Sequence, residues 1–160
     1  MNRIEQVREV VDDILLHMSD SVERRCAYLH LYGVAQACAL IAQKRGENVE
    51  LAVIAGMLHD ISSYATMDAA EHAHKSAGMA EEIMKSLNVF TEEEIEIVCN
   101  AIYNHSDKDM VHACFDEVLK DADVMQRCLY NPLFPVKVQE KMRYEKLKEE
   151  FGIMGEVSKF

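Results

Sequence analysis

Apolar residues recur every three or four positions along almost the whole chain, which is the spacing of one face of an α-helix. The strict alternation of apolar and polar residues that is typical of strands is almost absent. The chain also has only 6 glycines and 2 prolines, too few for a protein rich in β-turns or long loops. The pattern therefore predicts an all-α protein.

Capping residues and stop signals divide this pattern into seven predicted helices. We expect them from Asn2 to Met18, from Asp20 to Gly46, from about Val49 to His59, from Asp68 to Leu87, from Thr91 to Tyr103, from about Asp109 to Cys128 and over about residues 135–151. The clearest start signal is the capping box of Thr91 and Glu94. No repeat, linker or low-complexity segment interrupts the series, so residues 1–160 are predicted to form one compact domain of about six or seven helices.

Length, charge and cysteine content narrow the class of protein. A chain of 160 residues is long enough to bury the core of a single domain. Its formal net charge of −11 argues against binding a nucleic acid polymer, which requires clustered lysine and arginine. The amino-terminal residues are too charged for a signal peptide, and the apolar run Leu51–Leu58 is too short to span a membrane. The five cysteines form no CxxC pair, so we expect reduced thiols and a cytoplasmic protein.

Several imidazoles and carboxylates lie where the helical pattern turns side chains toward the core. They are His30, His59, Asp60, His74, His105 and Asp123. One such histidine alone is more often a hydrogen-bonded core residue than a ligand. Together they have no matching set of buried lysine or arginine, so an empty cluster would suffer carboxylate repulsion and imidazole desolvation. A divalent metal resolves this conflict, because neutral imidazole and carboxylate are preferred ligands of transition metals.

The adjacent pair His59–Asp60 closes an apolar run in the stretch "AGMLHDIS". Neighbouring side chains on a helix point about 100° apart, because a turn takes about 3.6 residues. Both can therefore reach one ion only where the helix ends. The "ISS" that follows Asp60 is consistent with such an end.

Three stretches resemble the signature blocks of the HD-domain superfamily of metal-dependent phosphohydrolases. They are "RRCAYLHLYGVAQACALIA", "AGMLHDIS" and "LKDADVMQ", in the order His, His-Asp, Asp. Two further blocks, "HKSAGMA" and "AIYNHSDKDM", are similar to those of subfamilies that hold two metals. The resemblance extends from about Arg24 to Arg127 and implies the all-α HD-domain fold.

The resemblance also implies a ligand set for one or two divalent ions, which could be Fe, Mn, Zn, Co or Ni. The first ion would be held by His30, His59, Asp60 and Asp123, and the second by Asp60, His74 and His105. Asp60 would bridge the two ions, and His59 and Asp60 would be the central catalytic residues. His72 is the rival to His74, because two positions on a helix differ by about 200° and only one can face inward.

The implied reaction is hydrolysis of a phosphate ester or anhydride in a nucleotide or another small phosphorylated metabolite by metal-activated water. Four cations could contact the phosphate, although a residue of this kind is more often a solvated or helix-capping one: Arg25, Lys75, Lys108 and Arg127. The same ligand set also resembles that of diiron HD-domain oxygenases, which activate O₂. A third possibility is a non-catalytic interaction module. The last helix could pack on the core or on a second copy, so a homodimer remains open.

Overall fold

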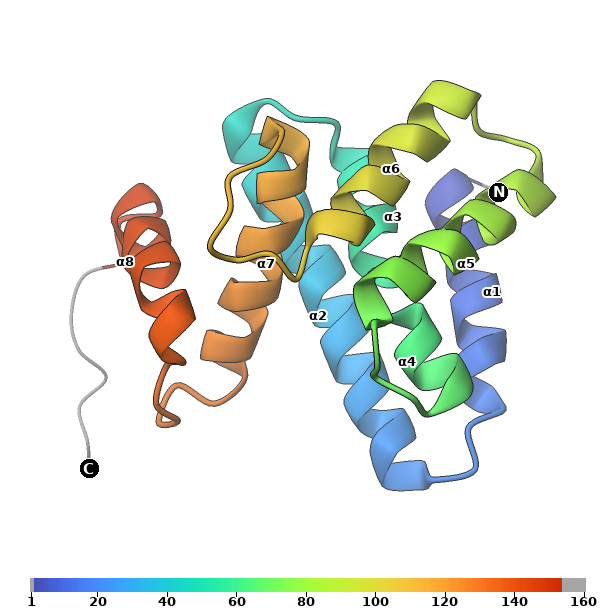
Figure 1. The fold of residues 1–160 in the computed structure, drawn as a ribbon, viewed down its shortest axis with the longest axis horizontal. Coiled ribbons are helices and arrows are strands. Elements are labelled where there is room, and N and C mark those ends of the chain that lie inside the picture. Colours follow the sequence, from blue (N-terminus) through green and yellow to red (C-terminus); the bar gives the residue numbers. More distant parts are fainter. Residues whose placement is uncertain (1, 154–160) are drawn as a thin grey trace.

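A computed structural model describes residues 2–153 and confirms the all-α architecture (Figure 1). Figure 1 shows α2 running through the middle of the molecule, with α7 and α8 on one side and α1, α4 and α5 on the other. The elements of this part of the chain are α1 (Arg3–Leu16), α2 (Ser21–Arg45), α3 (Val49–Leu58), α4 (Ile61–Thr66), α5 (His72–Leu87), α6 (Glu92–Asn104), α7 (Cys114–Tyr130), the 3₁₀ helix η1 (Val138–Glu140) and α8 (Lys141–Glu150).

The predicted capping signals hold the ends of α2 and α6. The carboxylate of Asp20 accepts hydrogen bonds from the backbone N–H groups of Val22 and Glu23, which have no partner within the helix. Gly46 ends α2 with a φ of 74°, a conformation that glycine adopts without strain. At the start of α6, Thr91 and Glu94 form both halves of the capping box.

The core forms where α2 packs against α3 and α7. A Cβ at Gly56 of α3 would lie 2.6 Å from the Cα of Ala35 in α2, so only glycine permits this close approach of the two helices. The buried apolar faces of the three helices pack as one continuous core. These contacts bring the inner face of α2, the end of α3 and the middle of α7 to one place.

Three predicted element boundaries are wrong. The residues after Asp60 form the separate helix α4, which the sequence pattern did not predict. Asp68 accepts a hydrogen bond from the N–H of Ala70 in a turn, and α5 begins only at His72, after Glu71 with a φ of 52°. Helix α7 begins at Cys114 instead of Asp109. Each shift lies next to the predicted ligands and changes which side chains face them.

The carboxyl-terminal segment is also less helical than predicted over residues 135–151, since α8 begins at Lys141. Ion pairs attach α8 to α7 and α2. Arg143 contacts Glu117 at 2.6 Å and Asp121 at 2.8 Å, and Arg45 contacts both Asp121 and Glu150 at 2.7 Å. Because α8 covers this side of α7, even its charged residue Asp121 is buried. Within residues 2–153, no helix has the length and apolar character needed to cross a membrane.

Candidate metal centre

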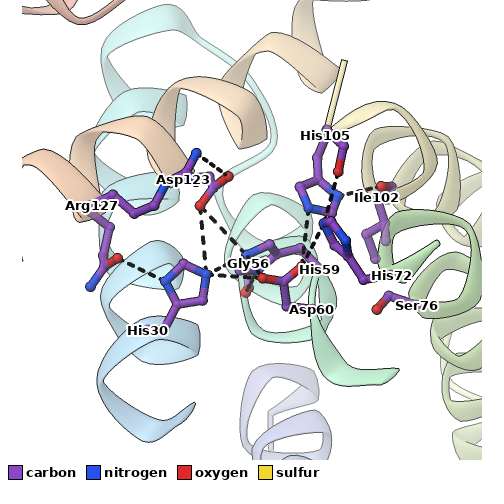
Figure 2. A network of polar contacts seen from close by, with 12 residues as sticks. His30, Gly56, His59, Asp60, His72, Ser76, Ile102, His105, Asp123 and Arg127 are labelled. Carbon is purple, nitrogen blue, oxygen red and sulfur yellow. Dashed lines mark hydrogen bonds and ion pairs between the residues drawn. The ribbon is translucent and has the colours of Figure 1, made fainter. Parts of the chain in front are cut away.

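Five of the six predicted ligands converge at one place (Figure 2). In the first half of the cluster, His30 Nε2 lies 3.0 Å from His59 Nε2 and 3.2 Å from Asp60 Oδ2. His59 Nε2 lies 3.4 Å from the same oxygen. Asp123 Oδ1 closes this half, 3.7 Å from His30 Nε2 and 4.0 Å from His59 Nε2. Side chains from α2, α7 and the junction of α3 with α4 thus face one another.

The second half of the cluster gathers around the other carboxylate oxygen of Asp60. Its Oδ1 lies 3.2 Å from His105 Nε2 and 3.6 Å from His72 Nε2. His105 follows the last residue of α6, and His72 is the first residue of α5. Asp60 therefore lies between the two halves and offers one oxygen to each.

The break between α3 and α4 explains how His59 and Asp60 can both face inward. His59 caps the end of α3 with helical angles, whereas Asp60 has φ −117° and ψ 15°, outside the helical region. This turn rotates the carboxylate of Asp60 toward the imidazole beside it. A helix end at this pair was expected from the sequence.

The predicted ligand His74 lies outside the cluster, and its rival His72 lies in it. His74 is exposed and stacks on Tyr103, with ring centroids 3.9 Å apart and planes 10° apart. Small residues such as Ala77 and Gly78 follow His74 in the sequence, but a Cβ at Gly78 would meet nothing within 4 Å, so no element approaches closely there. Because α5 begins at His72, that residue projects from the helix end toward Asp60.

Each of the four clustered imidazoles is oriented by a hydrogen bond from its Nδ1. His59 Nδ1 donates to the carbonyl of Gly56 at 2.8 Å, and His105 Nδ1 donates to that of Ile102 at 2.6 Å. His72 Nδ1 lies 3.2 Å from the carbonyl of Ala69, and His30 Nδ1 lies 2.9 Å from Gln126 Oε1. An oxygen acceptor requires a proton on Nδ1, so the neutral form of each ring has an unprotonated Nε2. That of His72 also lies 2.9 Å from the hydroxyl of Ser106, which can donate to it.

This arrangement fits a bound cation. The Nε2 lone pairs of His30 and His59 face each other at 3.0 Å, and other lone pairs face the carboxylate of Asp60. Asp60 Oδ1 is buried and accepts no hydrogen bond from the described residues. Three overlapping triplets have ligand atoms within 4.8 Å of one another: His30, His59 and Asp60; His59, His105 and Asp123; and Asp60, His72 and His105. Facing lone pairs of this kind repel one another unless a positive charge lies between them.

Burial and neighbouring charges shift the pKa values of four residues of the cluster. Burial would raise the pKa of Asp123, but the nearby ammonium of Lys108 holds it well below its usual range. Burial likewise opposes ionisation of Asp60, and the surrounding imidazoles, His59 foremost, keep the pKa of Asp60 well below its usual range. Burial lowers the pKa of His105 and favours its neutral form. Burial opposes protonation of His59, but the neighbouring carboxylate of Asp60 raises the pKa of its imidazole. These shifts favour ionised carboxylates and a neutral His105, and they make His59 the most basic of the shifted imidazoles.

Two of the predicted phosphate-contacting cations lie at the site, and two lie elsewhere. Lys108 Nζ donates to Asp123 Oδ2 at 2.7 Å, and Arg127 lies 3.3 Å from the same oxygen. Lys75 instead pairs with Asp68 at 2.9 Å. Arg25 is exposed on α2, and neither Lys75 nor Arg25 is among the described residues that line the cavity at the cluster.

A cavity of about 570 Å³ opens over the cluster and is bordered by its ligands and by the segment that precedes α8. Lys137, on this segment, lines the cavity and forms no ion pair with any residue of the described chain. Sequence reasoning missed Lys137, as it missed Gln126 and the buried Glu140 that pairs with Arg127. Gln126 lies three residues after Asp123 on α7, so helical spacing places it on nearly the same face. Lys137 and Glu140 lie beyond the end of α7, and periodicity carries no signal for them.

Comparison with known proteins agrees with this geometry. The HD domain family model matches residues 27–128, which include four of the clustered histidines and both carboxylates. The fold is similar to the crystal structure of a predicted HD superfamily hydrolase from an uncultured Thermotogales bacterium, with a TM-score of 0.61 and 20% identity over 91% of this chain and 87% of that chain. A search of curated proteins finds no match. Because the family model covers more than half of the sequence, the chain belongs to the HD-domain family.

Proposed function

We propose that this protein is a metal-dependent phosphohydrolase that cleaves a phosphate ester or anhydride of a small metabolite. The observation that carries the proposal is the convergence of four Nε2 atoms on the two oxygens of Asp60, beside a cavity with cationic side chains at its border. The structurally similar Thermotogales protein is described as a predicted HD superfamily hydrolase, which is consistent with this proposal.

The residues present would hold two divalent ions. His30, His59, Asp60 and Asp123 form the first set of ligands, and Asp60, His72 and His105 form the second. When bound, such ions lower the pKa of water and stabilise charge on phosphate oxygens. This ligand set replaces the predicted one, with His72 in place of His74.

The protein supplies orientation and charge to that chemistry. Gln126 and the carbonyls of Gly56, Ala69 and Ile102 fix the imidazole rings, as in other sites where a hydrogen bond on one ring nitrogen sets the direction of the other. Lys108 and Arg127 occupy Asp123 Oδ2, so only Oδ1 faces the histidines. Water that enters the cavity can reach the cluster. The proposed hydrolysis therefore needs no side-chain nucleophile.

Lys137 is the best-placed side chain to bind the phosphate. Lys137 is exposed, lines the cavity and has no carboxylate partner among residues 2–153. Lys108 and Arg127 also line the cavity, but each is already paired with Asp123. We therefore assign phosphate attraction to Lys137, and orientation of Asp123 to Lys108 and Arg127.

The experiment that tests the proposal combines metal analysis with phosphate release. Protein purified without oxygen is analysed for bound metal and then incubated with nucleotides, sugar phosphates and alkyl phosphates, with and without O₂. We expect phosphate release that needs metal but not O₂, and its loss together with loss of bound metal in His59→Ala and Asp60→Ala. The matched control is His17→Ala, because His17 is a highly exposed histidine outside the cluster.

Two outcomes would overturn the proposal. Full phosphate release by Asp60→Ala would show that the cluster is not the catalytic centre. Turnover that requires O₂ and bound iron, without phosphate release from any member of the panel, would instead support the oxygenase alternative.

A further inference from the structure

A second cavity, of about 360 Å³, adjoins the metal centre and has no role in the mechanism above. It lies between α2, the end of α7 and the segment that leads to η1. Five residues line both this cavity and the one over the cluster: His30, Tyr64, Arg127, Lys137 and Glu140. The two cavities are therefore neighbouring compartments of one site, with Lys137 at their border.

The two compartments differ in chemical character. The cavity over the cluster is bordered by carboxylates, imidazoles and cations. The second cavity is walled mainly by apolar and aromatic side chains: Leu29, Tyr64, Tyr130, Phe134, Pro135 and Val136. Its charged residues lie at the shared border, where Glu140 is already paired with Arg127. Beyond that border, the side chains able to hydrogen-bond are Gln126, whose Oε1 already binds His30, the hydroxyl of Tyr130 and the weakly polar thiols of Cys26 and Cys128. The wall therefore offers few partners for the hydroxyl groups of a polyol.

We infer that the second cavity binds the organic group of the substrate, and that this group is apolar. The inference rests on the proposed phosphohydrolase function, because it places the phosphate at the cluster and Lys137 and the remainder of the ester next door. A volume of about 360 Å³ falls in the range of small-molecule sites. Burial of an apolar group there removes hydrocarbon from water, whereas a sugar would lose hydration without replacement. The substrate class is thus a phosphate ester of an aromatic or aliphatic alcohol.

The first test compares two esters of equal chemical reactivity. Both 2-phenylethyl phosphate and glycerol 3-phosphate release a primary alcohol, so a difference in kcat/KM reports binding of the organic group. We expect kcat/KM to be at least about tenfold higher for the phenylethyl ester, in line with burial of one aromatic ring. Equal values for the two esters, in an enzyme that hydrolyses both, would overturn the inference and leave the proposed function intact.

A steric variant tests which cavity provides the preference. Leu29→Trp places an indole at the wall of the second cavity, and Leu40→Trp places one on the same helix at similar exposure, 51% against 48%, outside the lining of both cavities. We expect Leu29→Trp to bring the ratio of kcat/KM for the phenylethyl ester to kcat/KM for glycerol 3-phosphate close to one, because the indole fills the space of the phenyl ring. Leu40→Trp should keep the preference. Retention of the full preference in Leu29→Trp would contradict the inference.

A measurement without turnover separates this inference from the proposed function. Saturation-transfer NMR detects contact of 2-phenylethanol with the protein and requires no hydrolysis. We expect a signal for the unsubstituted protein and for Leu40→Trp, and a much weaker one for Leu29→Trp. Contact without phosphate release from any ester would refute the phosphohydrolase proposal alone. No contact with the unsubstituted protein would refute the apolar site.

Discussion

The ammonium group of Lys108 lies 2.7 Å from Asp123 Oδ2, and both side chains are almost fully buried, with 7% and 8% exposed. The same Nζ donates to the carbonyl of His105 at 2.5 Å. One lysine thus orients residues from both halves of the metal centre. A cation so close to metal ligands would normally repel metal ions, but here it is neutralised by the oxygen of Asp123 that faces away from the histidines.

Lys108→Met should weaken metal binding, because Asp123 and His105 lose the hydrogen bonds that orient them. Loss of such supporting contacts typically costs about 10–100-fold in metal affinity. Titration with a competing chelator measures the change. Lys75→Met is the matched control, since Lys75 pairs with Asp68 on the surface. Equal chelator curves for the two variants would show that Lys108 has no orienting role.

His72→Ala and His74→Ala should have opposite outcomes although the residues are two positions apart. His72 Nε2 lies 3.6 Å from Asp60 Oδ1, so its removal is expected to lower the metal content from two ions per chain toward one. His74 stacks on Tyr103, and its removal should leave the metal content unchanged. Elemental analysis of both purified variants measures the number of metal ions per chain and so identifies which histidine is a ligand. Metal loss in His74→Ala, with full content in His72→Ala, would restore the original sequence-based assignment.

Gly33→Ala tests how strongly His30 depends on its hydrogen bond to Gln126. A Cβ at position 33 would lie 2.8 Å from Cγ of Gln126, so the amide must move away from His30. We expect a fall in metal affinity of roughly tenfold with little loss of stability, because alanine favours the helix by up to about 1 kcal/mol.

Two comparisons control this prediction. If the effect acts through Gln126, adding Gln126→Ala to Gly33→Ala should cause little further loss. Gly78→Ala, where a Cβ meets nothing within 4 Å, should raise the free energy of unfolding by about 0.5–1 kcal/mol and leave metal affinity unchanged. A large additional loss in the double variant would mean that Gly33 acts by another route.

The attachment of α8 should depend on pH through Glu150. Its ion pair with Arg45 lowers the pKa of Glu150 below the ordinary value of 4.5. A carboxyl whose pKa is lower in the folded state stabilises the protein above its unfolded pKa, and this contribution disappears as the pH falls through the folded value. Glu150→Gln should therefore reduce stability at about pH 7, by up to about 1 kcal/mol.

Thermal unfolding of Glu150→Gln and of the unsubstituted protein at about pH 7 and about pH 3 checks the sign, since the difference should vanish at the lower pH. Glu149→Gln, on the same helix with an exposed side chain, should match the unsubstituted protein at both pH values. A difference that persisted in acid would assign the effect to packing and not to charge.

Periodicity and capping were sufficient to predict the all-α fold because both depend on interactions between residues that are close in the sequence. Asp20, Gly46 and the capping box of Thr91 act within a few residues, and all three hold helix ends as expected. The start of α5 was wrong because Asp68 forms a turn, and the left-handed conformation of Glu71 delays the helix. That shift of four residues also places His72, and not His74, at the helix end that faces Asp60.

The centre was only partly predictable for a similar reason. His30, His105 and Asp123 lie on apolar helical faces, so their inward direction could be read from spacing. Lys137 and Glu140 lie beyond the end of α7, in a segment that has no amphipathic pattern. Their position follows from the ion pairs that hold α8 in place, which involve residues far apart in the sequence.

The two carboxylate oxygens of Asp60 face residues from two different groups of helices. One faces residues of the α2, α3 and α7 core, and the other faces His72 and His105, which come from the neighbouring helices α5 and α6. Substitutions confined to α5 and α6 could thus remove the proposed second ion and leave the ligands of the first in place. The core formed by α2, α3 and α7 would be unchanged.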